Sequence, residues 1–300
     1  MDQRQPPDDF TARDGFAPVP GAALYYREIG QGPPCIVLHG GPGFDHKYLL
    51  PDLDRLADKY RLIYYDQRGR GRSGANVRPS DVSIQSEIDD LEGLRAYLGL
   101  EQIALVGHSW GGLLAMEYAL RMAQRVSRLI LLNTGPASHG DCVLFEQERD
   151  AKAPADAELL RALRLRRGHA EGDLATRSMY YRVYFRATLR PPELLDRLCE
   201  HLQVGWTKAD VLKARAIGQR LWSETYGTPT YDLLPQLAHL PMPTLVLHGD
   251  YDFIPLTCVS HIADAIPGSR LVVLPDCGHF SYLERSDAVR HALADFFQTS

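Results

Sequence analysis

The sequence predicts an α/β protein in which helices cover a mostly parallel central sheet. Short apolar runs alternate with segments that carry apolar residues at helical spacing, and this strand–helix–strand order is typical of parallel sheets. The alternation stops between residues 136 and 240, where helical patterns continue without a convincing strand. We therefore expect a core domain made of residues 1–135 and 241–300, with residues 136–240 inserted as a helical cap.

The predicted strands are compact and rich in leucine or β-branched residues, as strands buried on both faces are. They are Ala22–Glu28, Cys35–Leu38, Arg61–Asp66, Ile103–Gly107, Arg128–Leu132, Thr244–His248 and Arg270–Leu274. Helical spacing predicts core helices at Ser83–Leu98, Gly111–Ala123 and Cys258–Ala265, and cap helices at Ala157–Arg167, Glu193–Leu202 and Ala209–Trp222. Residues 1–18 are rich in proline, aspartate and glutamine, and this composition predicts a loose arm.

Composition and charge exclude several classes of protein. The 300 residues are 45% apolar and 24% charged, which is typical of a globular chain near the upper size of a single core. The net charge of −5 does not suit a general nucleic-acid binder. Five cysteines without a C-x-x-C pair argue against a disulfide framework or a zinc site. Because the N-terminus is polar and no 18-residue apolar run is present, we expect a cytoplasmic protein without a membrane partner.

Ser109 is the candidate nucleophile. It is the central residue of a G-x-S-x-G motif, residues 107–111, which lies between a predicted buried strand and a predicted helix. Such a tight turn requires small residues on both sides of the serine, and it exposes the hydroxyl at the end of the sheet, beside the N-terminus of the helix. The context makes an incidental serine in a glycine-rich turn the weaker interpretation.

A second glycine-rich loop follows the predicted strand Cys35–Leu38. It reads His39-Gly-Gly-Pro-Gly43. Its glycines allow the backbone to approach the nucleophile closely, and proline restricts the loop's shape. We expect the main-chain N–H groups of Gly41 and Trp110 to form an oxyanion hole, while His39 anchors the loop through a hydrogen bond. A tight turn without a catalytic role is the alternative.

A nucleophilic serine needs a base and an acid that orients it. His279 follows the predicted strand Arg270–Leu274 and is the candidate base. Two aspartates follow the preceding predicted strand, and we favour Asp252 as the acid over Asp250, which we expect to hold the turn. The chain order Ser109, Asp252, His279 is the order of an α/β-hydrolase.

A G-x-G-x-x-G string at residues 69–74 is not expected to bind a dinucleotide. It follows the predicted strand Arg61–Asp66, but a helix does not begin directly after it, and no acidic residue follows on a second strand. We interpret it as a structural turn near the active site. Cys277 lies near the candidate base, but Ser109 already supplies a nucleophile, so we interpret it as an incidental thiol.

The motifs together resemble those of the proline iminopeptidase branch of the α/β-hydrolase fold. The resemblance rests on residues 39–43 (H-G-G-P-G), 66–73 (D-Q-R-G-R-G-R-S), 107–112 (G-H-S-W-G-G), 249–252 (G-D-Y-D) and 278–279 (G-H). It covers both parts of the predicted core domain and fades in the cap. It implies an aminopeptidase that removes an N-terminal proline or another small apolar residue from peptides, without a metal or cofactor.

The resemblance also implies a site for the substrate's α-ammonium group, which the family builds from cap glutamates. Glu224 is the best counterpart, with an ordinary surface glutamate as the alternative. Some related peptidases carry a second glutamate directly after the catalytic aspartate, where this chain has Phe253. Trp206, Trp222 and Tyr181, together with Tyr180 and Tyr184, are candidate pocket-lining residues, although aromatic residues at this spacing also occur in cores.

Three functions remain open from the sequence. The first is an aminopeptidase that acts through an acyl-enzyme on a small-molecule or short-peptide substrate. The second is a carboxylesterase, or a lactone- or amide-cleaving relative, which a pocket without paired carboxylates would favour. The third is a ligand-binding protein that keeps the three residues but turns over poorly. The sequence does not indicate an oligomeric state.

Overall fold

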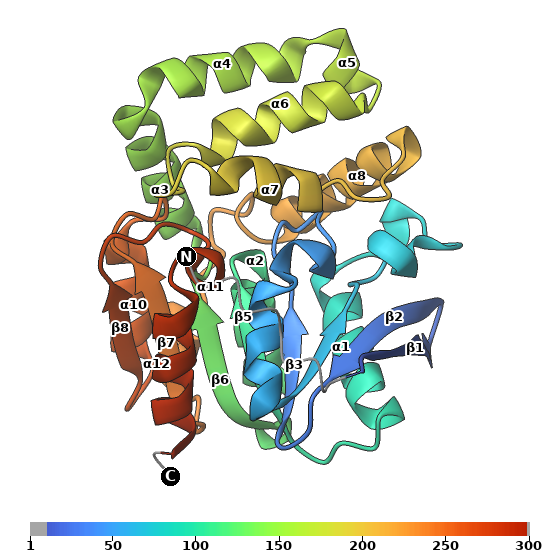
Figure 1. Cartoon of the computed structure of the whole chain (residues 1–300), viewed down its shortest axis with the longest axis vertical. Helices are drawn as coiled ribbons and strands as arrows, with labels where there is room; N and C mark the ends of the chain where they lie inside the picture. Colours follow the sequence, from blue (N-terminus) through green and yellow to red (C-terminus); the bar gives the residue numbers. More distant parts are fainter. Residues whose placement is uncertain (1–10, 299–300) are drawn as a thin grey trace.

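A central eight-stranded sheet organises residues 11–298, the part of the chain that the computed structural model describes. Its strands lie in the order β1-β2-β4-β3-β5-β6-β7-β8 (Figure 1). They are β1 (Arg13–Val19), β2 (Ala22–Ile29), β3 (Pro34–Leu38), β4 (Arg61–Tyr65), β5 (Ile103–His108), β6 (Val126–Leu132), β7 (Thr244–Gly249) and β8 (Arg270–Leu274). Strand β2 is antiparallel to β1 and β4, and β4, β3, β5, β6, β7 and β8 run parallel to one another. The predicted mostly parallel sheet is confirmed.

The prediction of a loose arm over residues 1–18 is wrong for its second part, because residues 13–18 belong to β1. This strand folds back on β2 through a turn at Pro20 and Gly21, where the glycine has a φ of 77°. The side chains of Ala17 and Val19 are buried, and a Cβ on Gly93 of α1 would lie 2.8 Å from Val19. Burial against this helix outweighs the polar composition that suggested an arm. Residues 1–10 lie outside the described residues.

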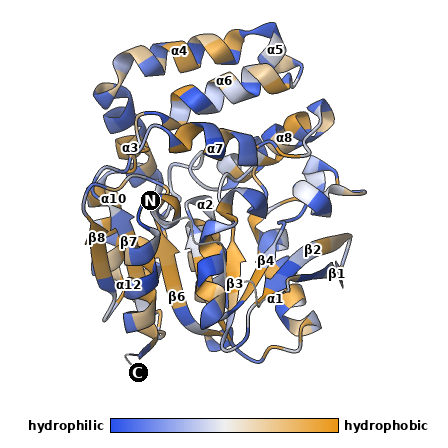
Figure 2. Cartoon of the chain, viewed as in Figure 1, coloured by the Kyte–Doolittle hydropathy of each residue, from blue (hydrophilic) through white to orange (hydrophobic). Residues whose placement is uncertain are grey.

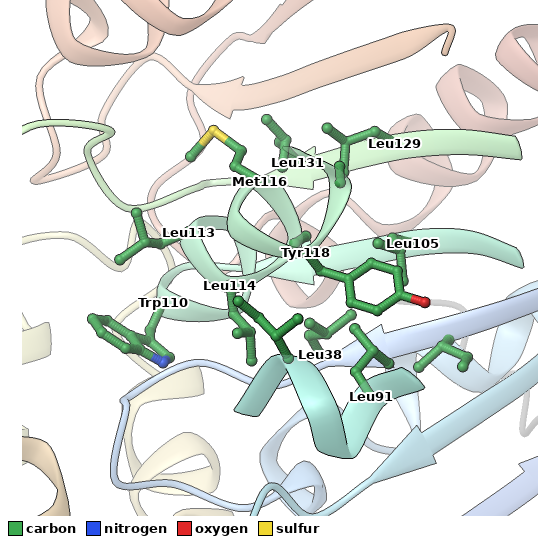
Figure 3. Packing of buried hydrophobic residues seen from close by; sticks show 14 of the residues in the cluster. Leu38, Leu91, Leu105, Trp110, Leu113, Leu114, Met116, Tyr118, Leu129 and Leu131 are labelled. Atoms are coloured by element: carbon green, nitrogen blue, oxygen red, sulfur yellow. The ribbon is translucent and has the colours of Figure 1, made fainter. Parts of the chain in front are cut away.

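Helices cover both faces of the sheet. The core helices are α1 (Ile84–Tyr97), α2 (Trp110–Arg121), α10 (Leu256–Ala265), α11 (Ser281–Glu284) and α12 (Ser286–Gln298). The helix α2 is apolar on nearly every side because it packs between the sheet and α1, where Leu114 and Tyr118 are fully buried beside Leu105 and Leu91 (Figure 3). Strand β3 and much of β6 are apolar, whereas β1 carries charged residues and the outer helices alternate apolar and polar residues (Figure 2).

The cap, residues 136–240, contains no strand of the sheet and lies across the carboxyl ends of the parallel strands (Figure 1). Its helices are α3 (His139–Lys152), α4 (Pro154–Leu165), α5 (Arg167–Ala170), α6 (Leu174–Phe185), α7 (Leu194–His201), α8 (Lys208–Glu224) and α9 (Leu234–Leu237). In α6, Tyr181 and Phe185 are four residues apart and therefore share one face of the helix. Both contact Phe44, which follows the glycine-rich loop at residues 39–43, so this face of α6 lies against the core.

Candidate active site

Ser109 lies at a strained turn between β5 and α2. Its backbone has a φ of 56° and a ψ of −122°, a region that non-glycine residues rarely adopt. The turn is possible only with glycine on either side, since a Cβ on Gly107 would overlap the carbonyl of Gly111, and a Cβ on Gly111 would overlap that of Leu38. The carbonyl of Ser109 accepts hydrogen bonds from the N–H groups of two further glycines, at residues 112 and 135, at 2.9 Å each. The partly exposed serine is thus held at the carboxyl edge of the sheet.

The loop at residues 39–43 lies directly beside Ser109. A Cβ on Gly40 would be 3.0 Å from the Cβ of Ser109, and Gly41 has a φ of 127° that favours glycine. His39 is fully buried and anchors the loop: its Nδ1–H donates to the carbonyl of Gly40 at 3.0 Å, and its Nε2 accepts from the N–H of Gln67 at 3.1 Å. Burial, with a smaller effect from a nearby arginine, lowers the pKa of His39 to about 3, so the ring is neutral at ordinary pH.

Trp110 is the first residue of α2, so its N–H has no acceptor within the helix. The N–H of Trp110 is therefore next to Ser109 and available to a ligand, and Gly41 lies one residue beyond Gly40 in the loop beside the serine.

Asp252 and His279 come from the loops that follow β7 and β8. The Nδ1 of His279 lies 3.0 Å from each carboxylate oxygen of Asp252. An ionised carboxylate only accepts hydrogen bonds, so Nδ1 carries the proton and Nε2 keeps a free lone pair. Burial opposes ionisation of Asp252, but the electrostatic interactions with the His279 and His248 rings and the hydrogen bonds from His279 and the N–H of Ile254 outweigh it and lower the pKa to about 2.

Asp250 has a different position. Its Oδ1 accepts from the N–H of Cys277 at 3.2 Å, so it links the two loops through the backbone. Cys277 is buried, and burial raises the pKa of its thiol, so the group stays protonated.

Asn133 is part of the site although the sequence analysis did not select it. It follows β6 directly, and its Nδ2 donates to Asp252 Oδ2 and to the carbonyl of Gly278, both at 2.9 Å. Its backbone φ of 44° lies in the left-handed region that asparagine tolerates better than most residues. The signal that could have found it is a polar residue at the carboxyl end of a buried parallel strand, where ligands and reactive groups gather in α/β proteins.

A second buried network joins the glycine-rich loop to the base. The hydroxyl of Tyr48 accepts from the N–H of Gly40 at 2.7 Å and donates to Nδ1 of His108 at 2.8 Å. The Nε2–H of His108 then donates to the carbonyl of His279 at 2.9 Å. Burial lowers the pKa of His108 to about 3, so it remains neutral and keeps this pattern of one donor and one acceptor. No sequence pattern identifies Tyr48, because it lies in a short 3-10 turn (His46–Leu49) of mixed composition.

The segment at residues 66–74 supports the same loop. Gln67 Nε2 donates to the carbonyl of His39 at 2.8 Å, and the guanidinium of Arg70, fully buried, pairs with Glu87 of α1 at 2.7 Å. Each charged group here has an opposite charge or a backbone partner, as buried charges require. Hydrogen bonds and ion pairs within the protein thus hold the conformation of residues 66–74.

The four cap residues selected from the sequence lie in two different places. Tyr181 contacts Phe44 at 5.3 Å between ring centroids, and Trp206 Nε1 donates to Asp45 Oδ2 at 3.1 Å, so both adjoin the residues that follow the loop at 39–43. Glu224 instead accepts from the N–H of Ile84, the first residue of α1, at 2.9 Å. Trp222 is half-exposed and packs against the backbone of the turn at Gly227. The structure therefore does not bring Glu224 or Trp222 into contact with Ser109, Asp252 or His279.

The other candidate aromatic residues approach the base from the cap. Tyr184 lies 5.4 Å from the ring of Phe253, and Phe253 lies 4.5 Å from the ring of His279. Tyr180 is stacked on Tyr184 at 5.9 Å.

Within residues 11–298, no three His, Cys, Asp or Glu side chains gather in a way that could hold a metal ion. In the same range, no helix has the length and apolar character needed to cross a membrane.

Known proteins have sequences and structures similar to those of this chain. The family profile described as "alpha/beta hydrolase fold" matches residues 33–286. A proline iminopeptidase of Saccharolobus solfataricus is 28% identical over 303 residues, which cover 94% of this chain and 91% of that protein. The crystal structure of a proline iminopeptidase from Mycobacterium smegmatis superimposes with a TM-score of 0.71 at 23% identity, covering 95% of this chain and 98% of that one. A thermophilic esterase from Thermogutta terrifontis superimposes with a TM-score of 0.69 at 26% identity, covering 95% and 98%.

Proposed function

The chain belongs to the alpha/beta hydrolase fold family and is a hydrolase of this fold; on that premise we propose that it cleaves its substrate through a Ser109 acyl-enzyme. One observation supports the proposal above all: His279 and Asp252 form a hydrogen-bonded pair on the loops that follow β7 and β8, in the same parallel sheet whose strand β5 ends at the strained Ser109. This is the arrangement that nucleophilic catalysis by serine needs.

Each residue then has a definite task. His279 Nε2 accepts the Ser109 proton as the hydroxyl attacks the acyl carbon, because Nδ1 is already committed to Asp252. The carboxylate of Asp252 stabilises the imidazolium that forms. The N–H groups of Gly41 and Trp110 stabilise the negative oxygen of the tetrahedral intermediate. His279 returns the proton to the leaving group, and it then activates the water that releases the acyl group.

The substrate that we propose first is a peptide with an N-terminal proline or small apolar residue. The proposal is supported by the similarity to proline iminopeptidases along more than nine-tenths of the chain and by the H-G-G-P-G and G-D-Y-D motifs, on which the resemblance to that family rests. The substrate's amino group would need a carboxylate near the acyl pocket, and Glu224 remains the proposed counterpart, although it accepts a hydrogen bond from α1.

A small ester or lactone is the second candidate substrate, and one observation favours it. Phe253 follows Asp252 directly and packs against the ring of His279, with Tyr184 and Phe145 behind it at 5.4 and 5.1 Å. An aromatic wall at this point binds a neutral acyl group better than an ammonium group that has to keep a carboxylate partner.

Parallel assays distinguish the two substrates. Proline and alanine arylamides are compared with short p-nitrophenyl esters, with Ser109→Ala as the inactive control. We expect cleavage of the free-amine arylamides; turnover of esters without any arylamide cleavage would replace the peptidase by the esterase.

A serine-directed fluorophosphonate should label the wild type but not Ser109→Ala. Wild-type protein that resists labelling would refute the catalytic assignment itself, and binding without turnover would favour a ligand-binding protein.

A further inference from the structure

The cap contacts the loops of both the acid and the base through one short connection. Residues 186–193 join α6 to α7, and within them Thr188 and Arg190 contact the loops that follow β7 and β8. Thr188 is completely buried there, although it lies in a connection rather than in a helix. Two oxygen atoms of this single residue serve the two loops.

The first of these atoms is the side-chain hydroxyl oxygen. Thr188 Oγ1 accepts from the N–H of Phe253 at 3.0 Å. Phe253 follows Asp252, whose Oδ1 in turn accepts from the N–H of Ile254 at 2.9 Å. The hydroxyl therefore holds the backbone on which the carboxylate depends for its orientation.

The second atom is the main-chain carbonyl oxygen, which accepts from the N–H of His279 at 3.1 Å. The approach is so close that a Cβ on Gly278 would overlap the carbonyl of Thr188. The glycine before the base is thus required by the cap, in addition to any requirement of the loop itself.

Glu284 of α11 also accepts hydrogen bonds from the backbone around the base. Its carboxylate accepts from the N–H of Gly278 at 3.0 Å and from that of Phe280 at 3.1 Å, on either side of His279. It also accepts from the N–H of Arg190 at 2.8 Å, two residues after Thr188. The base is therefore held in a backbone frame to which the cap and α11 both contribute.

We propose that Thr188 is a positioning residue through which the cap aligns Asp252 with His279. The proposal rests on the catalytic roles proposed above for those two residues. Without the hydroxyl, the N–H of Phe253 would be buried without an acceptor, and the loop would relax to find one. A misplacement of about 1 Å in a catalytic pair is enough to cost roughly 100-fold in rate. The effect falls on kcat, because Thr188 touches the machinery through the backbone and does not need to touch the substrate.

The test compares Thr188→Val with Thr188→Ser. Valine has the shape of threonine but cannot accept the hydrogen bond, whereas serine can. We expect kcat for an activated p-nitrophenyl ester to fall roughly 10-fold or more in the valine variant, with KM within about twofold of the wild type. The serine variant should retain kcat within about threefold.

Thr225→Val is the matched control. Thr225 is also completely buried in the cap, and its hydroxyl donates to the carbonyl of Leu221 within the end of α8 at 2.9 Å. The same atom is removed, but no loop of the site is involved. We expect a loss of stability and an unchanged kcat.

Amide hydrogen exchange supplies a readout that cap stability alone would not move. In Thr188→Val, exchange at Phe253 should accelerate, while exchange at Gly278 and Phe280 should stay slow because Glu284 still accepts from both. Equal kcat and equal Phe253 exchange in the valine and serine variants would overturn the proposal. Should the valine variant not fold, Thr188→Cys, with a weaker acceptor, replaces it, and an unchanged kcat there also overturns the proposal.

The rate of labelling by a fluorophosphonate separates this proposal from the function on which it rests. A wild type that is not labelled refutes the catalytic roles. A wild type that is labelled at the same rate as Thr188→Val refutes only the positioning role. We expect labelling of the wild type and a decrease in the valine variant that parallels the decrease in kcat.

Discussion

Removal of the Asn133 side chain should weaken the active site without touching any of the three residues proposed to react. In Asn133→Gly, the backbone can keep its φ of 44° because glycine adopts this region readily. The two hydrogen bonds from Nδ2, to Asp252 and to the carbonyl of Gly278, are lost. The loops of the acid and the base then lose a side chain that donates to both.

The size of the expected loss in stability depends on whether the acceptor of each hydrogen bond is charged. The bond to the charged carboxylate of Asp252 is worth about 1.5–3 kcal/mol and the bond to the carbonyl of Gly278 about 0.5–1.5 kcal/mol, so the free energy of unfolding should fall by about 2–4.5 kcal/mol. If about half of this also orients Asp252 in the transition state, kcat/KM should fall about 5- to 45-fold.

The assay combines urea unfolding with steady-state hydrolysis of an activated ester. Asn76→Gly is the matched control, since Asn76 also has a positive φ, of 58°, but lies exposed in a loop. The control measures the effect of glycine on the unfolded chain, which we expect to be below about 1 kcal/mol. Subtracting it leaves the contribution of the two hydrogen bonds. A kcat/KM within twofold of the wild type, in a folded Asn133→Gly protein, would refute the reasoning that the bond to Asp252 matters for catalysis.

Three further predictions concern the buried parts of the site. Gly278→Ala should lower kcat/KM at least about 100-fold, because its methyl group displaces the carbonyl of Thr188; activity assays and circular dichroism together check this, and a fully active variant would contradict it. Tyr48→Phe leaves two buried polar groups unpaired, one of them on His108, and should lower the free energy of unfolding by about 1–3 kcal/mol in urea titrations. His39 and His108 have a pKa of about 3 in the folded chain against about 6.5 when unfolded, so the unfolded chain takes up protons first and stability is lost as pH falls from about 6.5 toward 3. At pH 5 each should contribute a loss of about 2 kcal/mol relative to pH 8, and His39→Gln should remove its share of that difference; an unchanged pH dependence would count against the buried neutral state.

Local patterns selected the candidate nucleophile, acid and base, because each follows a predicted strand of the sheet. The strand Ile103–Gly107 and the helix after it required a turn at Ser109, and the sheet order then brings residues that follow β7 and β8 to the same edge. The choice of Asp252 over Asp250 agrees with the geometry, since Asp252 contacts His279 and Asp250 contacts Cys277.

The sequence predicted less of the structure in the cap and at the N-terminus. The sequence predicted cap helices close to α4, α7 and α8. It could not predict the partner of Glu224, because the contact with Ile84 joins residues 140 positions apart. Strand β1 was missed because its pairing with β2 and its burial against α1 decide its conformation, while residues 1–18 as a whole are rich in proline, aspartate and glutamine.

The sequence by itself determined the fold class, the sheet that carries the site and the chemical types available at its edge. These follow from periodicity and from turns that only glycine permits, and both are local properties of the chain. The tertiary structure alone decided how the candidate reactive groups are held. Asn133 joins the loops of Asp252 and Gly278, Tyr48 joins the glycine-rich loop to His108 of β5, and Thr188 contacts the Phe253 backbone from the cap. Such contacts depend on where distant segments meet, since a hydrogen bond forms only when donor and acceptor lie within about 3 Å.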